Sequence, residues 1–299
     1  MKKAQPSGAT SSTTEVVRLD GLDPSRSSRS LAELLRLDGK VALVTGGGGN
    51  GLGHAISHRL AEQGATLAVL DIDETAARTS ARSVADRWGT RAIPVVADVS
   101  DWNSVKNGVD SVLDSLGSID ILVNNAGGSG GIAKGGQRVM TGMPFSSMSP
   151  EEIDLVTQIN LQGAMYVTRA ALAGMLERGT GRIVMIASEG AKIGIAGSAV
   201  YSAAKAGLIG LTRVLASELG PNGVTVVCVC PGFMVGPTQI KALSDGGPFA
   251  DMIADAFSRS SIGRPSVYDE VAGAVAFFAG SAGEYAHGTA ISIGGGMSD

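Results

Sequence analysis

The sequence predicts an α/β fold built on a doubly wound parallel sheet of about seven strands. Short apolar runs alternate with helix-length amphipathic segments from residue 37 to residue 299, which is the pattern of repeated β-α units. The apolar runs do not alternate polar and apolar residues, as expected of strands covered on both faces. Because crossover connections are right-handed, a Rossmann-type sheet with helices on both faces is the simplest arrangement.

Each expected element follows from this alternation. The expected strands are 40–45, 66–70, 92–97, 119–123, 182–187, 224–229 and 289–293. The expected helices run from the glycines after the first strand to about residue 63, then to residue 87, and near 101–116, 149–177, 200–219, 238–258 and 267–280.

Residues 1–36 differ from the rest and are expected to form an N-terminal extension. Residues 1–14 are rich in Ser, Thr, Ala and Gly and lack the apolar core of a secretory signal, so they are expected to be disordered. Ser30 and Glu33 form a capping-box pattern that predicts a short helix near residues 30–37. Residues 37–299 are expected to form a single domain.

Composition excludes several classes of function. The formal charge of −4 and the lack of a basic cluster argue against a nucleic-acid partner. No apolar run reaches the roughly 18 residues that span a membrane. The two cysteines, Cys228 and Cys230, lie two apart in an expected strand and are interpreted as buried thiols, neither metal ligands nor a disulfide framework. A reducing, cytoplasmic location is therefore expected.

Tyr201 and Lys205 are four residues apart at the start of an expected helix, so they share one helix face. A free tyrosine titrates near ~10, and a neighbouring cation favours its ionised form. Such a phenol can serve as a general acid or base. Taken alone, the pair is more often an ordinary surface Tyr and Lys.

A glycine-rich segment, residues 46–53, joins the first strand to the first helix. Glycines there let backbone N–H groups approach a pyrophosphate at the helix N-terminus. Asp71 ends the second strand, 71 − 51 = 20 residues beyond Gly51, which is the spacing of a ribose-binding carboxylate. Its charge would repel a 2′-phosphate, which predicts NAD(H) in preference to NADP(H). Asp73 is the better candidate for the next helix cap.

His54 and His58 are four residues apart on the helix that follows the glycines. Such a pair can bind zinc, but no adjacent Glu and no third ligand is evident in the sequence. The two side chains are interpreted as packing or surface histidines, and no metal is expected.

Taken together, residues 37–296 resemble the short-chain dehydrogenase/reductase family. The glycine motif of that family is usually T-G-x-x-x-G-x-G, whereas residues 45–53 contain one additional residue; aligning from Gly47 restores the spacing. Further matches, in the order the family has them, are Asp98-Val99, Asn124-Asn-Ala-Gly127, Asn160, Ser188 placed 201 − 188 = 13 residues before Tyr201, Lys205, Pro231-Gly232, 269–272 and 288–295.

The resemblance implies a catalytic tetrad. In this tetrad Tyr201 exchanges a proton with the substrate oxygen, and Ser188 hydrogen-bonds that oxygen. Lys205 lowers the pKa of Tyr201 and binds the nicotinamide ribose, while Asn160 holds a water that relays protons to Lys205. The implied cofactor-binding residues are Gly47, Asn50, Gly51, Leu52, Gly53, Asp71, Ile72, Asp98, Val99, Asn125, Ala126, Gly127, Tyr201, Lys205, Pro231, Gly232 and Met234.

Three functions remain open. The favoured one is an NAD(H)-dependent oxidoreductase that interconverts a secondary alcohol and a ketone. The others are an NADPH-preferring carbonyl or 3-oxoacyl-thioester reductase and a dinucleotide-binding regulator without turnover. Substrate choice is expected to depend on residues 128–150, 189–198 and 233–261. Lys134 and Arg138 are interpreted as solvated loop charges. The resemblance also implies a homotetramer, or a dimer.

Overall fold

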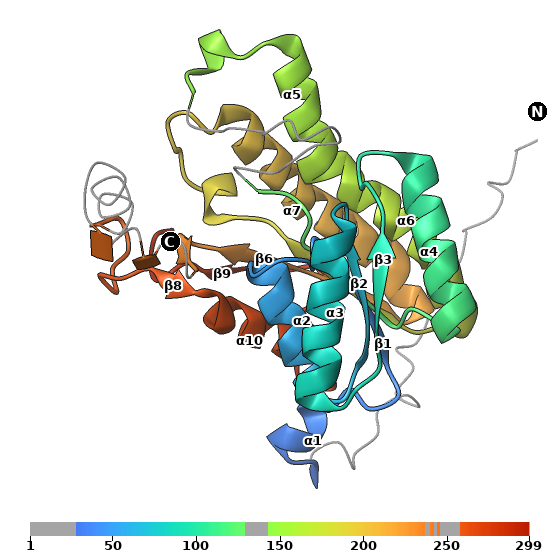
Figure 1. Cartoon of the computed structure of the whole chain (residues 1–299). Coiled ribbons are helices and arrows are strands. Elements are labelled where there is room, and N and C mark those ends of the chain that lie inside the picture. Colours follow the sequence, from blue (N-terminus) through green and yellow to red (C-terminus); the bar gives the residue numbers. More distant parts are fainter. Residues whose placement is uncertain (1–27, 129–142, 237–239, 242–243, 246–257, 299) are drawn as a thin grey trace, which may run out of the picture.

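The computed structural model describes residues 28–128, 143–236, 240–241, 244–245 and 258–298. Its centre is a parallel sheet of seven strands in the order β3-β2-β1-β4-β5-β6-β9 (Figure 1). The strands are β1 Val41–Thr45, β2 Thr66–Asp71, β3 Ala92–Val96, β4 Ile121–Asn124, β5 Gly181–Ile186, β6 Val224–Pro231 and β9 Ala290–Ile293. The chain builds the sheet outwards from β1 to β3 and then returns to the other side of β1 at β4. The predicted doubly wound fold is confirmed, with its switch point between β1 and β4.

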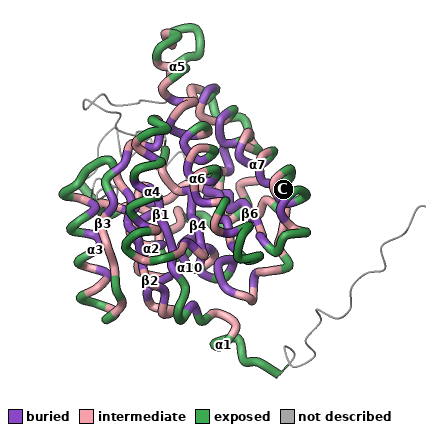
Figure 2. The backbone as a smooth tube through the Cα atoms, turned by 90° about the vertical axis from the view of Figure 1, so that its right-hand side faces the viewer, coloured by how far each residue is buried: buried purple, intermediate pink, exposed green. Residues whose placement is uncertain are grey.

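Helices cover both faces of this sheet. One buried cluster joins the strands to α2 (Leu52–Glu62), α3 (Glu74–Trp88) and α10 (Tyr268–Ala279). The other joins them to α4 (Trp102–Leu116), α6 (Gly163–Arg178) and α7 (Ala199–Leu219). Strands β1 and β4 are buried along their whole length (Figure 2). Their unbroken apolar runs therefore reflect the two helical layers.

Polar caps and glycines set the ends of the helices. The Asp73 side chain accepts a hydrogen bond from the backbone N–H of Ala76 at the start of α3, which confirms the predicted cap. Asp101 caps α4 in the same way. Both helices end at left-handed glycines, Gly89 with φ of 67° and Gly117 with φ of 81°. Glycine adopts this conformation without the strain a Cβ would introduce.

The prediction of a single helix over 149–177 is wrong in one respect, because a π-helical turn interrupts it. The structure has α5 (Pro150–Thr157), a π-helical turn at Gln158–Gln162, and then α6. The turn contains Asn160, whose Nδ2 donates to the carbonyl oxygen of Val156 at 3.1 Å. A π-helical turn leaves the apolar periodicity on either side intact, so the hydrophobic pattern does not reveal it.

Helix α1 (Leu31–Leu35) has the capping box formed by Ser30 and Glu33. It lies against the end of α10, where the Ser281 hydroxyl donates to the carbonyl oxygen of Leu34 at 3.1 Å. The expected disorder of residues 1–14, most of the expected helix 238–258, and Lys134 and Arg138 lie outside the described residues. Two short strands, β7 (Met234–Val235) and β8 (Ser266–Val267), precede and follow that region in the sequence and pair with each other in parallel.

Within the described ranges, no helix combines the length and apolar character needed to cross a bilayer. The same ranges contain no group of three or more His, Cys, Asp or Glu side chains placed to hold a metal ion.

Candidate active site

A groove of about 250 Å³ lies at the carboxyl ends of the central strands, beside the switch point. This is where open α/β sheets bind their ligands. Most of the predicted site residues line it, from the start of α2 to the turn after β6. The lining residues are Gly46, Gly51, Leu52, Gly53, Asn125, Gly127, Gly128, Ile186, Ala187, Ser188, Tyr201, Lys205, Pro231, Gly232 and Met234.

The glycine-rich turn brings two backbone segments into contact at one end of the groove. A Cβ on Gly53 would lie 2.1 Å from the carbonyl oxygen of Gly46, so only glycine fits there. Helix α2 starts at Leu52, and its N-cap residue Gly51 makes no side-chain cap hydrogen bond. The first N–H groups of this helix of 11 residues are therefore left for a ligand, and the helix dipole favours an anion there. The residues present fit a dinucleotide pyrophosphate.

The additional residue in this turn changes which glycine lines the groove. Gly47, counted among the cofactor-binding residues, is buried: its N–H donates to the carbonyl oxygen of Leu70 at 3.0 Å, and a Cβ would lie 2.9 Å from Val69. Gly46 lines the groove in its place, with φ of 60°. The extra length is taken up beyond Gly47, where Gly49 turns the chain with φ of 69°. In the structure Gly46, and not Gly47, is therefore the glycine of this pair that lines the groove.

Asp71 lies at the end of β2, next to the glycine-rich turn. Its Oδ2 accepts from the N–H of Gly48 at 3.0 Å, and its Oδ1 accepts from the N–H of Asp73 at 3.1 Å. Each carboxylate oxygen can accept a further hydrogen bond. Neither Asp71 nor the exposed Ile72 lines the groove, and Asn50 lines a different cavity of about 550 Å³ outside α2.

Thr45 connects the glycine-rich turn to the end of β4. Its hydroxyl accepts hydrogen bonds from the N–H groups of Asn125 and Ala126, both at 3.0 Å. The Asn125 amide in turn donates to the carbonyl oxygens of Thr45 and Gly46, at 2.9 and 3.1 Å. Thr45 is not among the residues predicted from the sequence, although its position directly before the glycines was a signal. Ala126 supports the groove wall without lining the groove.

Asp98 and Val99 follow β3 and do not line the groove. The Asp98 Oδ1 accepts from the N–H and the hydroxyl of Ser100, at 2.9 and 2.6 Å. The Val99 side chain packs against Gly163, where a Cβ would approach Val99 Cγ2 to 2.9 Å. The structure thus gives Val99 a packing partner at the start of α6.

Ser188 and Tyr201 meet in the groove from β5 and α7. Ser188 begins the turn after β5, and its hydroxyl accepts from the N–H of Gly190 at 3.0 Å. Burial raises the pKa of Tyr201 above its ordinary value, and a hydrogen bond with Ser188 acts in the opposite direction. A tyrosine with a raised pKa keeps its proton at neutral pH, as a proton donor to a carbonyl oxygen must.

Lys205 is 3% exposed, and its Nζ lies 5.8 Å from the centre of the Tyr201 ring. Burial lowers its pKa from 10.5 to about 8. That Lys205 lowers the pKa of Tyr201 stays a prediction; in the protein alone burial has the largest effect on that pKa and raises it. The positive charge of an oxidised nicotinamide would favour the ionised phenol.

Asn160 lies beneath the groove without lining it. Its Oδ1 accepts from the N–H of Gly128 at 2.8 Å. A Cβ on Gly127 would lie 2.6 Å from Asn160 Oδ1 and 3.4 Å from Lys205 Nζ, so the three residues converge around that glycine. The π-helical turn places Asn160 here. Ile186 and Ala187, at the end of β5, line the groove but were not predicted, although they lie just before Ser188. Gly46 and Gly128 also line it and belong to the segments 46–53 and 128–150 that the sequence indicated.

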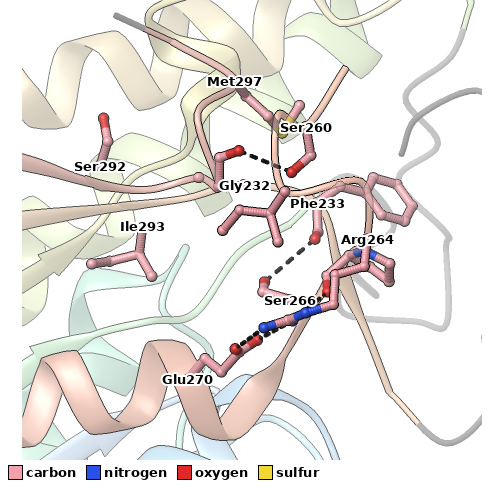
Figure 3. Close-up of a pocket in the computed structure, with 13 residues that line it drawn as sticks. Gly232, Phe233, Ser260, Arg264, Ser266, Glu270, Ser292, Ile293 and Met297 are labelled. Atoms are coloured by element: carbon pink, nitrogen blue, oxygen red, sulfur yellow. Dashed lines mark hydrogen bonds and ion pairs between the residues drawn. The ribbon is translucent and has the colours of Figure 1, made fainter. Parts of the chain in front are cut away.

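A smaller cavity, of about 170 Å³, shares Gly232 with the groove (Figure 3). Arg264 and Glu270 form a two-pronged ion pair there, with N–O distances of 2.9 and 2.6 Å. Hydrogen bonds from Arg264 hold the pKa of Glu270 at about 2. The two charges neutralise one another, and the remaining wall includes Phe233 and Ile293.

Comparison with known proteins agrees with this geometry. A family model described as short chain dehydrogenase matches residues 40–245. Nodulation protein G of Azospirillum brasilense is 36% identical over 258 residues, covering 86% of this chain and 98% of the relative. The 3-oxoacyl-(acyl-carrier-protein) reductase FabG of Escherichia coli is 32% identical over 263 residues, covering 88% and 99%. A crystal structure of NAD⁺-bound xylitol dehydrogenase superposes with a TM-score of 0.76 at 31% identity, covering 87% and 99%. The chain therefore belongs to the short-chain dehydrogenase/reductase family and is an oxidoreductase that acts on CH–OH groups with a nicotinamide dinucleotide.

Proposed function

We propose that the chain is an NAD(H)-dependent oxidoreductase that interconverts a secondary alcohol and a ketone. The observation that carries the proposal is that one groove joins the uncapped N-terminus of α2 to Ser188, Tyr201 and Lys205, with Asp71 beyond its glycine-rich end. The bound nicotinamide supplies or accepts the hydride. The protein supplies the anion site, the proton and the position of the reacting oxygen.

In the direction of ketone reduction, Tyr201 donates its phenolic proton to the carbonyl oxygen of the substrate. Ser188 donates its hydroxyl hydrogen to the same oxygen, which holds the substrate and stabilises the negative charge that develops. The raised pKa of Tyr201 suits this direction, because the phenol is protonated at neutral pH. In the direction of alcohol oxidation, Tyr201 as a tyrosinate takes up the hydroxyl proton.

Lys205 and Asn160 act from behind Tyr201. The Lys205 ammonium donates to the carbonyl oxygen of Ile186 at 2.9 Å, and its other hydrogens are available to the ribose next to the nicotinamide. Asn160 fixes the backbone at Gly128, and we assign it the water that returns protons to Lys205. The pKa of Lys205, about 8, is close to the pH at which such a relay works.

We propose NAD(H) as the cofactor because of Asp71. Its carboxylate can accept hydrogen bonds from the adenosine ribose hydroxyls, and its negative charge opposes a 2′-phosphate. The xylitol dehydrogenase whose structure resembles this chain was crystallised with NAD⁺. The apolar wall of the cavity beside Gly232 favours a substrate whose remaining part is partly hydrophobic.

A 3-oxoacyl-thioester reductase is the second candidate. It is favoured by the 32% identity to the Escherichia coli 3-oxoacyl-(acyl-carrier-protein) reductase over nearly the full length of that protein. The carboxylate of Asp71 argues against an NADPH-preferring enzyme of this kind.

The apolar side chains of Met165, Leu176 and Val214 remain exposed on α6 and α7, which supports a homotetramer assembled through these helices. The two free, buried cysteines suit a cytoplasmic, reducing compartment.

The test is a screen of cyclic, aromatic, steroid and sugar alcohols with NAD⁺ and NADP⁺, followed by a 3-oxoacyl thioester with NADH and NADPH. The proposal expects turnover of a secondary alcohol, with a higher kcat/KM for NAD⁺ than for NADP⁺. Thioester reduction with NADPH as the better cofactor would support the second candidate instead.

A further inference from the structure

One peptide group in the glycine-rich turn is held at both of its poles. The N–H of Gly48 donates to Asp71 Oδ2 at 3.0 Å. The carbonyl oxygen of the same peptide belongs to Gly47 and accepts from the Ser80 hydroxyl of α3 at 2.8 Å. Because a peptide is planar, fixing its carbonyl group also fixes the direction of its N–H group.

His54 of α2 extends this chain of hydrogen bonds. Its Nδ1 lies 2.8 Å from the Ser80 oxygen. The one Ser80 proton is donated to Gly47, so the Ser80 oxygen accepts and His54 carries its proton on Nδ1. Burial lowers the pKa of His54, so the ring is neutral at pH 7 with this proton in place. All three hydrogen bonds are donated in the same direction, from His54 to Ser80, from Ser80 to the peptide and from the peptide to Asp71. Hydrogen bonds in such a chain polarise and strengthen one another.

The turn is shaped for this arrangement. A Cβ on Gly48 would lie 2.8 Å from Asp71 Oδ2 and 2.9 Å from Ala76, and a Cβ on Gly47 would meet Val69 at 2.9 Å. Ser80 is 1% exposed, so water does not readily replace its hydroxyl.

We propose that His54, Ser80 and the Gly47–Gly48 peptide form a positioning relay that holds the Asp71 carboxylate ready for the two hydroxyls of the adenosine ribose. The proposal rests on the proposed function, in which Asp71 selects NAD(H). The relay keeps Asp71 from turning aside to admit a 2′-phosphate. Ser80 and His54 are thus specificity-determining residues that lie outside the groove.

The chain contains its own control for the relay. Ser83 and His58 form the neighbouring Ser–His pair between the same two helices, with Ser83 Oγ 3.3 Å from His58 Nε2. No hydrogen bond connects this pair to the described part of the glycine-rich turn. Substitutions there lose a similar Ser–His contact without disturbing the peptide.

The experiment measures dissociation constants of NADH and NADPH from nicotinamide fluorescence, which needs no substrate. Ser80→Ala is expected to weaken NADH binding between about 3-fold and 10-fold, the effect of one positioned hydrogen bond. NADPH binding is expected to weaken less, so the preference for NADH falls. Ser83→Ala is expected to keep the wild-type preference. In an Asp71→Ala background, Ser80→Ala is expected to change the preference no further.

A role of Ser80 in stability alone would lower Tm and leave the ratio of the two dissociation constants unchanged, and that result would overturn the relay. If Ser80→Ala does not fold, His54→Phe removes only the outer donor, and His58→Phe is its control. The preference for NADH is expected to fall in His54→Phe, by less than in Ser80→Ala, and to stay unchanged in His58→Phe. If the ratio of the NADPH and NADH dissociation constants is the same in His54→Phe and His58→Phe, the relay is contradicted. Tighter binding of NADPH than NADH by the wild type would overturn the cofactor choice itself, which is a different outcome.

Discussion

Lys205 donates a hydrogen bond from Nζ to the carbonyl oxygen of Ile186 at 2.9 Å. This contact ties the ammonium group of α7 to the last residue of β5, two positions before Ser188. The ammonium group is therefore placed by the sheet as well as by its own helix. Lys205 is also almost fully buried, so its ammonium charge is largely removed from water.

The stability of the protein should depend on pH through Lys205. Its folded pKa of about 8 lies below the ordinary 10.5, so between these values the unfolded chain binds the proton and the folded chain does not. The free energy of unfolding therefore rises with pH across this window, by about 3 kcal/mol in the limit. Below pH 8 both states are protonated, and the cost of burying the charge is present in full.

Chemical unfolding of the wild type and of Lys205→Met at a series of pH values tests this. The variant is expected to be the more stable of the two at pH 7, and its advantage should shrink as the pH rises from 8 towards 10. Above pH 10 the raised pKa of Tyr201 acts the other way, because the unfolded chain then loses its phenolic proton first. A constant difference between the two proteins from pH 7 to 10 would show that Lys205 is not buried as a cation.

Gly53→Ala should damage both folding and cofactor binding. The new Cβ would lie 2.1 Å from the carbonyl oxygen of Gly46 and 2.6 Å from Asn125 Nδ2, so the turn must open. We expect a loss of about 1–3 kcal/mol in the free energy of unfolding and NADH binding at least about tenfold weaker. Gly273→Ala in α10 is the control, since nothing lies within 4 Å of its Cβ. That variant is expected to gain up to about 1 kcal/mol. Equal NADH affinity in the two variants would contradict the close packing of the turn.

Ser188→Ala should lower kcat by about 10²- to 10³-fold, the usual effect of removing a donor to a developing oxyanion. Ser202→Ala, on the helix that carries Tyr201, is the control. The Ser202 hydroxyl is buried and has no hydrogen-bond partner among the residues that the structure describes, so its removal should leave the stability unchanged or slightly raised. A similar loss of kcat in both variants would indicate a general disturbance of the groove.

Much of the fold and most of the site could be predicted from the sequence because they depend on local patterns. The apolar runs of β1 and β4 are unbroken since both sheet faces are covered, and Ser188, Tyr201 and Lys205 carry recognisable spacings. Three features depend on long-range contacts instead. The Asn160 side chain in the π-helical turn is hydrogen-bonded to Gly128, Thr45 is hydrogen-bonded to Asn125, and the glycine-rich turn is hydrogen-bonded to Ser80.

The pKa of Tyr201 shows a further limit of sequence reasoning. The spacing of Tyr201 and Lys205 predicts a cation near the phenol, and the structure places Nζ 5.8 Å from the ring. The spacing does not reveal that both groups are buried. Burial raises the pKa of the phenol and lowers that of the amine, so each group favours its neutral form.

The proposed chemistry depends above all on the Tyr201 hydroxyl, and Tyr201→Phe removes that oxygen while keeping the ring. The measurement is the rate of NADH formation from the best secondary alcohol of the screen, together with the dissociation constant of NADH. The proposed mechanism predicts a fall in kcat of at least about 10²-fold, with NADH affinity within about twofold of wild type. A Tyr201→Phe variant that binds NADH normally and keeps a substantial part of the wild-type kcat would contradict it.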